Sequence, residues 1–175
     1  MTEILERRHT IALLVDNEPG VLARVIGLFA GRGYNIESLT VSEVDTVKGY
    51  SRITIVTSGT EMVIQQIKAL LSRLVPVHEV HDLSVAGPHL ERELALIKIN
   101  NTGEQRIEAL RIADLFRARA LDSTLKSFVF ELTGSPRKIN AFIDLMNAIG
   151  DIEVCRGGVV AIARGSKIEI STPSR

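Results

Sequence analysis

The chain has 175 residues, which is enough for two domains of about 80–90 residues each. Its 45% hydrophobic and 24% charged residues are typical of a folded protein, and 21 lysines and arginines balance 21 aspartates and glutamates, so no basic excess favours nucleic acid as a partner. No apolar run approaches the roughly 20 residues of a membrane-spanning helix, and a single cysteine, Cys155, cannot form an internal disulfide. The N-terminal segment lacks the apolar core of a signal peptide, and we expect a cytoplasmic protein.

The first predicted elements are a strand at residues 10–15 and a helix that begins at Pro19. Proline suits a first helical position, because its missing N–H would have no partner there. One face of this helix is apolar at the spacing i, i+3, i+4, i+7, and consists of Leu22, Val25, Ile26 and Phe29. Gly31 and Gly33 then end the helix, since glycine readily adopts the left-handed backbone of a C-cap.

Three strands and a second helix follow in the first half of the chain. The strands are predicted at residues 34–44, 50–57 and 75–83. The helix before the last strand carries an apolar face of Val63, Ile67, Leu70, Leu71 and Leu74. The order strand-helix-strand-strand-helix-strand is that of the split βαβ, or ferredoxin-like, arrangement, an antiparallel sheet with both helices on one face.

The same order repeats after a Gly- and Pro-bearing segment at residues 86–89. One helix is predicted to open near Asn101, and another begins at Pro136 with Ser135 as its cap. We therefore predict an α+β protein of two ferredoxin-like (βαββαβ) domains. No counterpart of the turn from Asn17 to Gly20 is expected in the second half, so the repeat is predicted to be one of topology and not of site.

The strongest candidate site is this first turn, with Asn17 and Gly20 before the helix and Asn35 after it. Free N–H groups and the positive end of the helix dipole can bind a carboxylate of the size that an amino acid carries. The alternative is purely structural, because an Asx-turn, a helix entry and a turn asparagine explain the same residues. Spacing alone leaves the two interpretations equally open.

No catalytic residue and no metal site is predicted. His78 and His81 are three residues apart, a spacing that puts them on opposite faces of a strand. Ser123 and Lys126 match the Ser-x-x-Lys pattern of serine acylases, but they fall in a strand-turn-strand segment and lack the partner motifs. Cys155 has no evident base, and we expect it near the core of the second half.

The residues around the first turn resemble those of a known family. Three segments carry the likeness: Asn17-Glu18-Pro19-Gly20-Val21-Leu22, Arg24-Val25-Ile26-Gly27-Leu28-Phe29 and Arg32-Gly33-Tyr34-Asn35-Ile36-Glu37-Ser38-Leu39-Thr40-Val41. Further matches at residues 51–55, 74–75, 91–94 and 156–165 extend it over almost the whole chain. On these residues the chain resembles the regulatory small subunit of acetolactate synthase (acetohydroxyacid synthase), which begins with an ACT domain. One departure is Gly157, where serine is expected.

The resemblance implies a non-catalytic subunit that activates a catalytic large subunit and mediates feedback inhibition by valine, sometimes also by isoleucine or leucine. Thiamine diphosphate, Mg²⁺ and FAD are expected in the large subunit and not in this chain. ACT domains of this family pair side by side as a homodimer, with the effector at the seam. The implied site is Asn17, Gly20, Val21 and Leu22 of one chain with Asn35 and Ile36 of its mate.

The expected domain limits are residues 8–85 for an ACT effector-binding domain, 86–92 for a linker and 93–166 for a C-terminal ferredoxin-like domain. Residues 167–175 are expected to form a disordered tail. An alternative from another class is a stand-alone amino-acid-sensing ACT protein, such as a transcriptional regulator. No helix-turn-helix pattern or basic face in the sequence supports that alternative.

Overall fold

The computed structural model describes residues 6–166 and 170, which fall into two compact units. The first unit holds the chain up to Leu90 and again from Val159 onward, and the second spans Glu91–Gly158. The domain limits expected from the sequence, residues 8–85 and 93–166, remain predictions. The two compact units have different limits, because the chain re-enters the first unit at Val159. The expected disordered tail lies outside the described residues, apart from Ile170.

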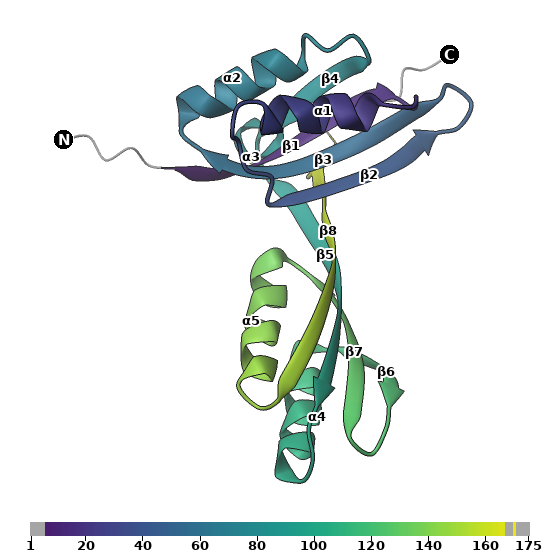
Figure 1. The fold of residues 1–175 in the computed structure, drawn as a ribbon, viewed down its shortest axis with the longest axis vertical. Coiled ribbons are helices and arrows are strands. Elements are labelled where there is room, and N and C mark those ends of the chain that lie inside the picture. The colour runs from purple at the N-terminus through teal and green to yellow at the C-terminus, as the bar shows by residue number, and fades with distance from the viewer. Residues whose placement is uncertain (1–5, 167–169, 171–175) are drawn as a thin grey trace, which may run out of the picture. The chain divides into compact units, whose positions relative to one another are not determined.

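The first unit has the predicted ferredoxin-like order with one short helix added. Its elements are β1 (Arg7–Asp16), α1 (Val21–Ala30), β2 (Ser38–Asp45), β3 (Tyr50–Gly59), α2 (Glu61–Leu71), β4 (Val77–Asp82) and α3 (Leu83–Ala86). The sheet is antiparallel in the order β2-β3-β1-β4, and α1 and α2 lie on one face of it (Figure 1). The addition is α3, which follows Asp82; the Asp82 carboxylate caps it by accepting a 3.0 Å hydrogen bond from the backbone N–H of Ser84.

The core of the first unit lies between the sheet and these two helices. Alternate residues of β1 point toward the helices and are fully buried, as the period of a strand requires. They pack with apolar residues of both helices and of β3: Val21, Val25, Phe29, Ile53, Ile55, Ile64, Ile67 and Leu71. Each such side chain contributes roughly 1.5–3 kcal/mol when it is fully buried, so the core holds α1 firmly in place.

The opposite face of the central strand β1 is also buried, because another part of the first unit covers it. Ala12 packs there against Leu83 of α3 and Ala161, which lies near the end of β8 (Asp151–Ala163). Arg52 donates a 2.8 Å hydrogen bond to the carbonyl oxygen of Ala161, and burial lowers the pKa of the Arg52 guanidinium. Thr40 donates a 2.9 Å hydrogen bond to the carbonyl oxygen of Val159. The last residues of β8 therefore belong to the packing of the first unit.

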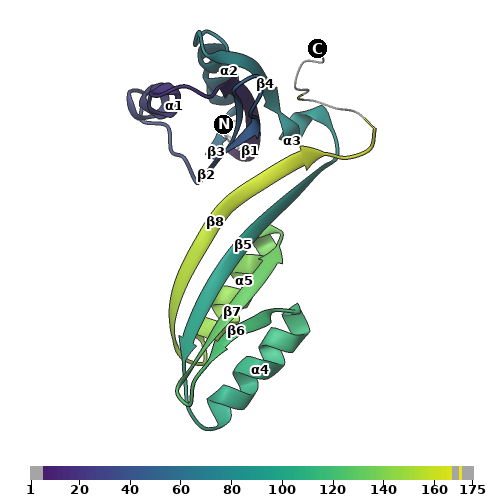
Figure 2. The same cartoon turned by 90° about the vertical axis from the view of Figure 1, so that its right-hand side faces the viewer.

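The second unit repeats the arrangement, as predicted. Its elements are β5 (His89–Asn100), α4 (Glu104–Phe116), β6 (Arg119–Ser123), β7 (Ser127–Gly134), α5 (Pro136–Asn147) and β8. The strands lie in the order β6-β7-β5-β8, with α4 and α5 on one face (Figure 2). Pro136 occupies the first turn of α5, and the Ser135 hydroxyl accepts a hydrogen bond from the backbone N–H of Lys138, so the predicted cap is confirmed.

A partly buried ion pair joins the strands β5 and β8 of the second unit, with Glu93 buried and Arg156 exposed. Arg156 donates two hydrogen bonds of 2.6 Å to the Glu93 carboxylate, and a third of 2.9 Å to the side-chain oxygen of Asn140 on α5. These bonds to Glu93 raise the pKa of Arg156, because they favour its charged form.

Some details differ from the sequence-based prediction. Helix α1 begins at Val21 and not at Pro19, which lies in the preceding turn. Leu22 and Ile26 are 37% and 36% exposed, because α1 is rotated so that Val21, Val25 and Phe29 face the core. Cys155 is exposed and does not pack in the core of the second unit.

Among the described residues, no helix combines the length and apolar character needed to cross a membrane.

Candidate functional site

The N-terminal end of α1 is an uncapped helix end. The helix begins after Gly20, whose φ of 86° lies in the left-handed region that favours glycine, and no side chain caps it. Its first turn carries no acidic residue. The first N–H groups of any helix lack partners within the helix, so these groups and the helix dipole can receive an anion.

The turn that leads into α1 is held to the rest of the sheet. Asn17 follows β1 directly, and its backbone N–H donates a 2.6 Å hydrogen bond to the carbonyl oxygen of Gly49 in the β2–β3 turn. The side of Gly20 where a Cβ would stand is open, with no heavy atom within 4 Å. A ligand can therefore approach the backbone of this turn closely.

The segment after α1 holds the second predicted asparagine in a fixed backbone. Gly33, with a φ of 69°, turns the chain out of the helix. The Thr57 hydroxyl donates a 2.6 Å hydrogen bond to the carbonyl oxygen of Asn35, and Ile36 packs against the core of the first unit. Asn35 is exposed, so its side-chain amide is available to a ligand.

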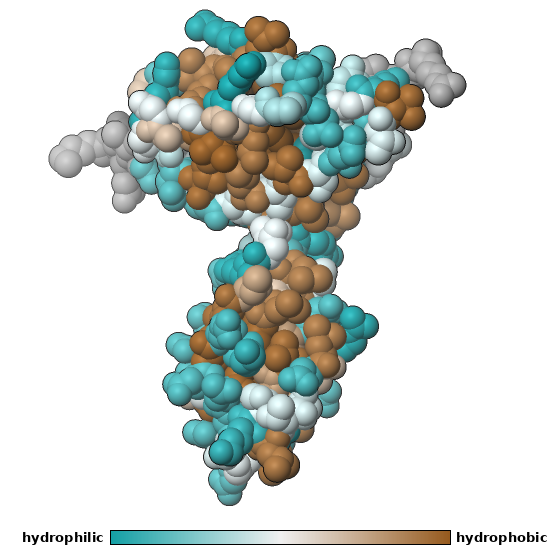
Figure 3. All heavy atoms as spheres, turned by 45° about the vertical axis from the view of Figure 1, so that its right-hand side comes forward, coloured by the Kyte–Doolittle hydropathy of each residue, from teal (hydrophilic) through white to brown (hydrophobic). Residues whose placement is uncertain are grey.

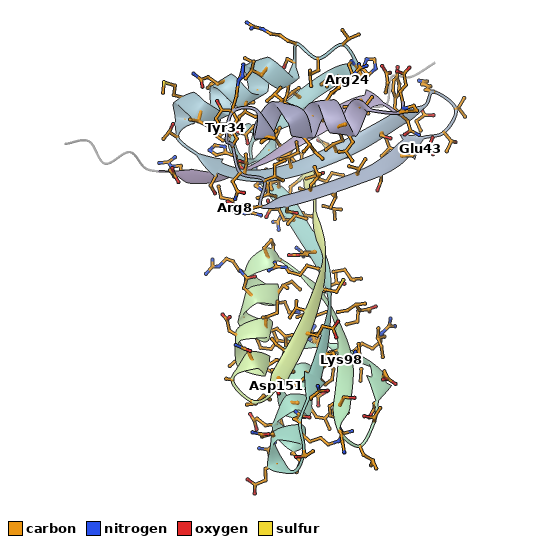
Figure 4. All side chains as sticks on the ribbon, viewed as in Figure 1. Arg8, Arg24, Tyr34, Glu43, Lys98 and Asp151 are labelled. Atoms are coloured by element: carbon orange, nitrogen blue, oxygen red, sulfur yellow. The ribbon has the colours of Figure 1, made fainter. Side chains whose placement is uncertain are left out.

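A single chain does not bring the predicted site residues together. Helix α1 has ten residues. At a rise of 1.5 Å per residue its ends are about 15 Å apart. Asn17 and Gly20 lie at one end and Asn35 at the other, as Arg24 and Tyr34 show on either side of α1 in Figure 4. The two groups of predicted site residues, called half-sites below, are thus too far apart within one chain to bind one small molecule.

The surface between these half-sites is apolar. Leu22 and Ile26 of α1 are exposed, and so are Val41 and Val44 of β2. Strand β2 is an edge strand, which pairs only with β3 among the described residues. Figure 3 shows apolar side chains gathered on one face of the first unit. Exposed apolar residues beside an unpaired strand edge are typical of a surface that another chain covers.

Two histidines of the first unit each contact the carboxylate of an aspartate. His78 lies 2.6 Å from the Asp16 carboxylate, and His9 lies 2.8 Å from that of Asp82 within the core of the first unit. Within residues 6–166 and 170 no three or more His, Cys, Asp or Glu side chains gather as a metal site would require.

Comparison with known proteins assigns the family. The family described as the small subunit of acetolactate synthase matches residues 92–165, and the AHAS small subunit-like ACT domain matches residues 11–79. A probable acetolactate synthase small subunit of Archaeoglobus fulgidus is 45% identical over 160 residues, which cover 91% of this chain and 99% of that protein. The chain belongs to the family of acetolactate synthase small subunits.

Other relatives of this small subunit agree. The small subunit of acetolactate synthase isozyme 3 from Escherichia coli is 44% identical over 162 residues, covering 92% of this chain and 98% of the relative. The crystal structure of the Thermotoga maritima small subunit matches with a TM-score of 0.82 and 36% identity, covering 92% of this chain and 99% of that chain. The chain is a regulatory, non-catalytic subunit with an ACT domain, and its family implies a catalytic large subunit as its partner.

Proposed function

We propose that this small subunit activates the large subunit and mediates feedback inhibition by valine, which binds where two ACT domains meet. The observation that carries the proposal is the uncapped end of α1, separated from Asn35 by the length of one helix. Two copies joined along their β2 edges by a two-fold axis would run antiparallel. The start of α1 in one copy would then lie beside Asn35 of the other.

The chemistry of the two half-sites suits an amino acid. The N–H groups after Gly20 would bind the carboxylate, and an asparagine amide, which both donates and accepts, would orient the ammonium group. Exposed Leu22 would contact an aliphatic side chain. One methylene changes such a contact by only about 0.8 kcal/mol, so isoleucine and leucine would be distinguished imperfectly from valine.

Inhibition would reach the active site through the dimer. A ligand that contacts two chains favours the one arrangement in which both half-sites are in place, and a coupling of about 1–3 kcal/mol would suffice for feedback. Thiamine diphosphate, Mg²⁺ and FAD would all be bound by the large subunit. Co-purification of the chain with that subunit separates this function from the alternative of a stand-alone amino-acid sensor.

The dimer surface can be tested by a charge on its edge. Val41 lies opposite Ile53 in the sheet, on the face that α1 covers, and is exposed. Val41→Lys should shift the free small subunit from dimer toward monomer and weaken valine inhibition together, because a lysine at an edge opposes strand pairing. Sedimentation velocity and inhibition assays measure the two effects. Val75→Lys, at an exposed position just before β4, is the matched control, and an equal effect there would contradict the proposed seam.

The second half-site is tested by Asn35→Ala. The variant keeps the hydrogen bond that the Thr57 hydroxyl donates to the backbone carbonyl oxygen of residue 35, so the fold should be unchanged. Loss of one hydrogen bond to a charged ligand, about 1.5 kcal/mol, should raise the dissociation constant of valine roughly tenfold. Isothermal titration calorimetry on the dimer gives that constant, and unchanged affinity would remove Asn35 from the site.

A further inference from the structure

A row of three side chains crosses the sheet of the first unit at the end of β1 that leads into α1. Asp16 is the last residue of this central strand, and Tyr50 of β3 lies opposite it in the sheet register. His78 of β4 completes the row, with its Nε2 atom 2.6 Å from the Asp16 carboxylate. An ionised carboxylate can only accept a hydrogen bond, so the imidazole N–H is the donor.

The rings of His78 and Tyr50 close over the end of β1. Strands β3 and β4 flank β1 on either side. Their backbones are therefore about 9–10 Å apart, which is twice the spacing of neighbouring strands. The two ring centroids are only 4.9 Å apart, however, and the rings meet edge to face. The contact with Tyr50 and the hydrogen bond to Asp16 together fix the imidazole of His78.

The backbone that carries the first half-site is tied to the same two strands. The N–H of Asp16 donates a 2.9 Å hydrogen bond to the carbonyl oxygen of Pro76, just before β4. The N–H of Asn17 donates its 2.6 Å hydrogen bond to the carbonyl oxygen of Gly49, just before β3. His78 adds a side-chain bond between β4 and this point. The turn that presents Asn17 therefore starts from a backbone that is fixed on both sides.

The second unit shows that a turn of this spacing does not require such a pair. The expectation that the second half has no counterpart of the first turn is wrong, since Asn100 and Gly103 repeat its Asn-x-x-Gly spacing. The residue before that asparagine is Ile99, which is fully buried in the core of the second unit, whereas Asp16 precedes the first turn. The histidine–aspartate pair therefore belongs to the first turn and not to the repeated arrangement of strands.

We propose that His78 is a positioning residue of the effector site, which sets the affinity for valine through Asp16. Its role is to hold the backbone from which Asn17 and Gly20 face the effector, without contact with the effector itself. A site that is ordered before binding loses less entropy when its ligand arrives, so the ligand binds more tightly. The inference rests on the proposed function, because it concerns the same half-site.

Replacement of the histidine separates hydrogen bonding from packing. His78→Leu keeps an apolar side chain against Tyr50 but cannot donate to Asp16, and should raise the dissociation constant of valine about three- to tenfold. His78→Gln supplies an amide donor in place of Nε2 and should restore most of the affinity. Isothermal titration calorimetry on the full-length dimer gives both constants. The inference is overturned if the glutamine variant binds no more tightly than the leucine variant, or if the leucine variant binds as the unaltered chain does.

The pairing with Asp16 is tested by a double-mutant cycle. Asp16→Ala alone should weaken valine binding by a similar factor, and the double variant with His78→Leu should be no weaker than either single variant, because both changes remove the same bond. Effects that multiply would show that the two residues act separately, and would overturn the role given to the pair. His81→Ala is the matched control and should bind valine as the unaltered chain does, since the imidazole Nε2 of His81 lies 3.1 Å from the carboxylate of Glu79 on the same strand.

A readout without valine separates failure of this inference from failure of the proposed site. Amide hydrogen exchange of Asn17, followed by NMR on the ligand-free chain, should be faster in His78→Leu, because local opening of the turn costs less there. Unchanged exchange would overturn the inference. If Gly20→Asp leaves the affinity for valine unaltered, the proposed function fails, and this inference with it. If Gly20→Asp weakens binding and His78→Leu does not, the positioning role alone fails.

Discussion

Gly20→Asp should make the reconstituted enzyme insensitive to valine while leaving its activation by the small subunit intact. The substitution places a carboxylate at the uncapped start of α1, where no neighbouring atom lies within 4 Å of the new Cβ. That charge would occupy the N–H groups proposed for the effector carboxylate and repel it. Loss of two charge-assisted hydrogen bonds is about 3 kcal/mol or more, a rise of over a hundredfold in the valine concentration for half-inhibition.

Gly20→Ala is the matched control for this variant. It imposes the same strain on a residue whose φ is 86°, but adds neither charge nor a group large enough to fill the turn. Assays of the reconstituted enzyme with and without valine should show inhibition weakened in Gly20→Ala, whose Cβ stands where the ligand approaches the backbone, and lost in Gly20→Asp. Undiminished inhibition in Gly20→Asp would place the effector elsewhere.

Arg156→Ala should destabilise the second unit strongly. The Glu93 side chain is 3% exposed, and the variant would leave its carboxylate buried without the two hydrogen bonds from the guanidinium. Removal of one partner from a buried pair costs about 3–5 kcal/mol, and the 38% exposure of Arg156 brings the expected loss to about 2–3 kcal/mol. Urea unfolding followed by circular dichroism should show a lower midpoint for the transition.

Two further variants show whether burial of Glu93 is the cause. The double variant Glu93→Leu with Arg156→Met removes both charges and should recover most of the stability, because no buried charge remains. Lys98→Ala breaks an exposed pair with Glu153 on the same sheet and should change stability by less than about 1 kcal/mol. An Arg156→Ala effect no larger than that of Lys98→Ala would contradict the prediction.

Periodicity predicted most of the fold because both units follow local rules. The apolar face predicted for the second helix names Ile67 and Leu71, which the core of the first unit buries. Turn chemistry fixed the start of α5 at Pro136. Residues 11–15 of β1 are apolar on both faces, and the pattern alone did not show what covers the face of Ala12. The end of β8 covers that face, from a position about 150 residues away in the chain.

The sequence by itself determined the two α+β units, the turn from Asn17 to Gly20 and the family, since these depend on local pattern and on residue identity. Only the tertiary structure decided that Leu22 and Ile26 face outward, because the rotation of α1 is set by packing against the sheet. It also decided that the first turn lies against the β2–β3 turn, where the backbone N–H of Asn17 donates a 2.6 Å hydrogen bond to the carbonyl oxygen of Gly49. Distance and burial are properties of the folded chain, and spacing along a sequence does not contain them.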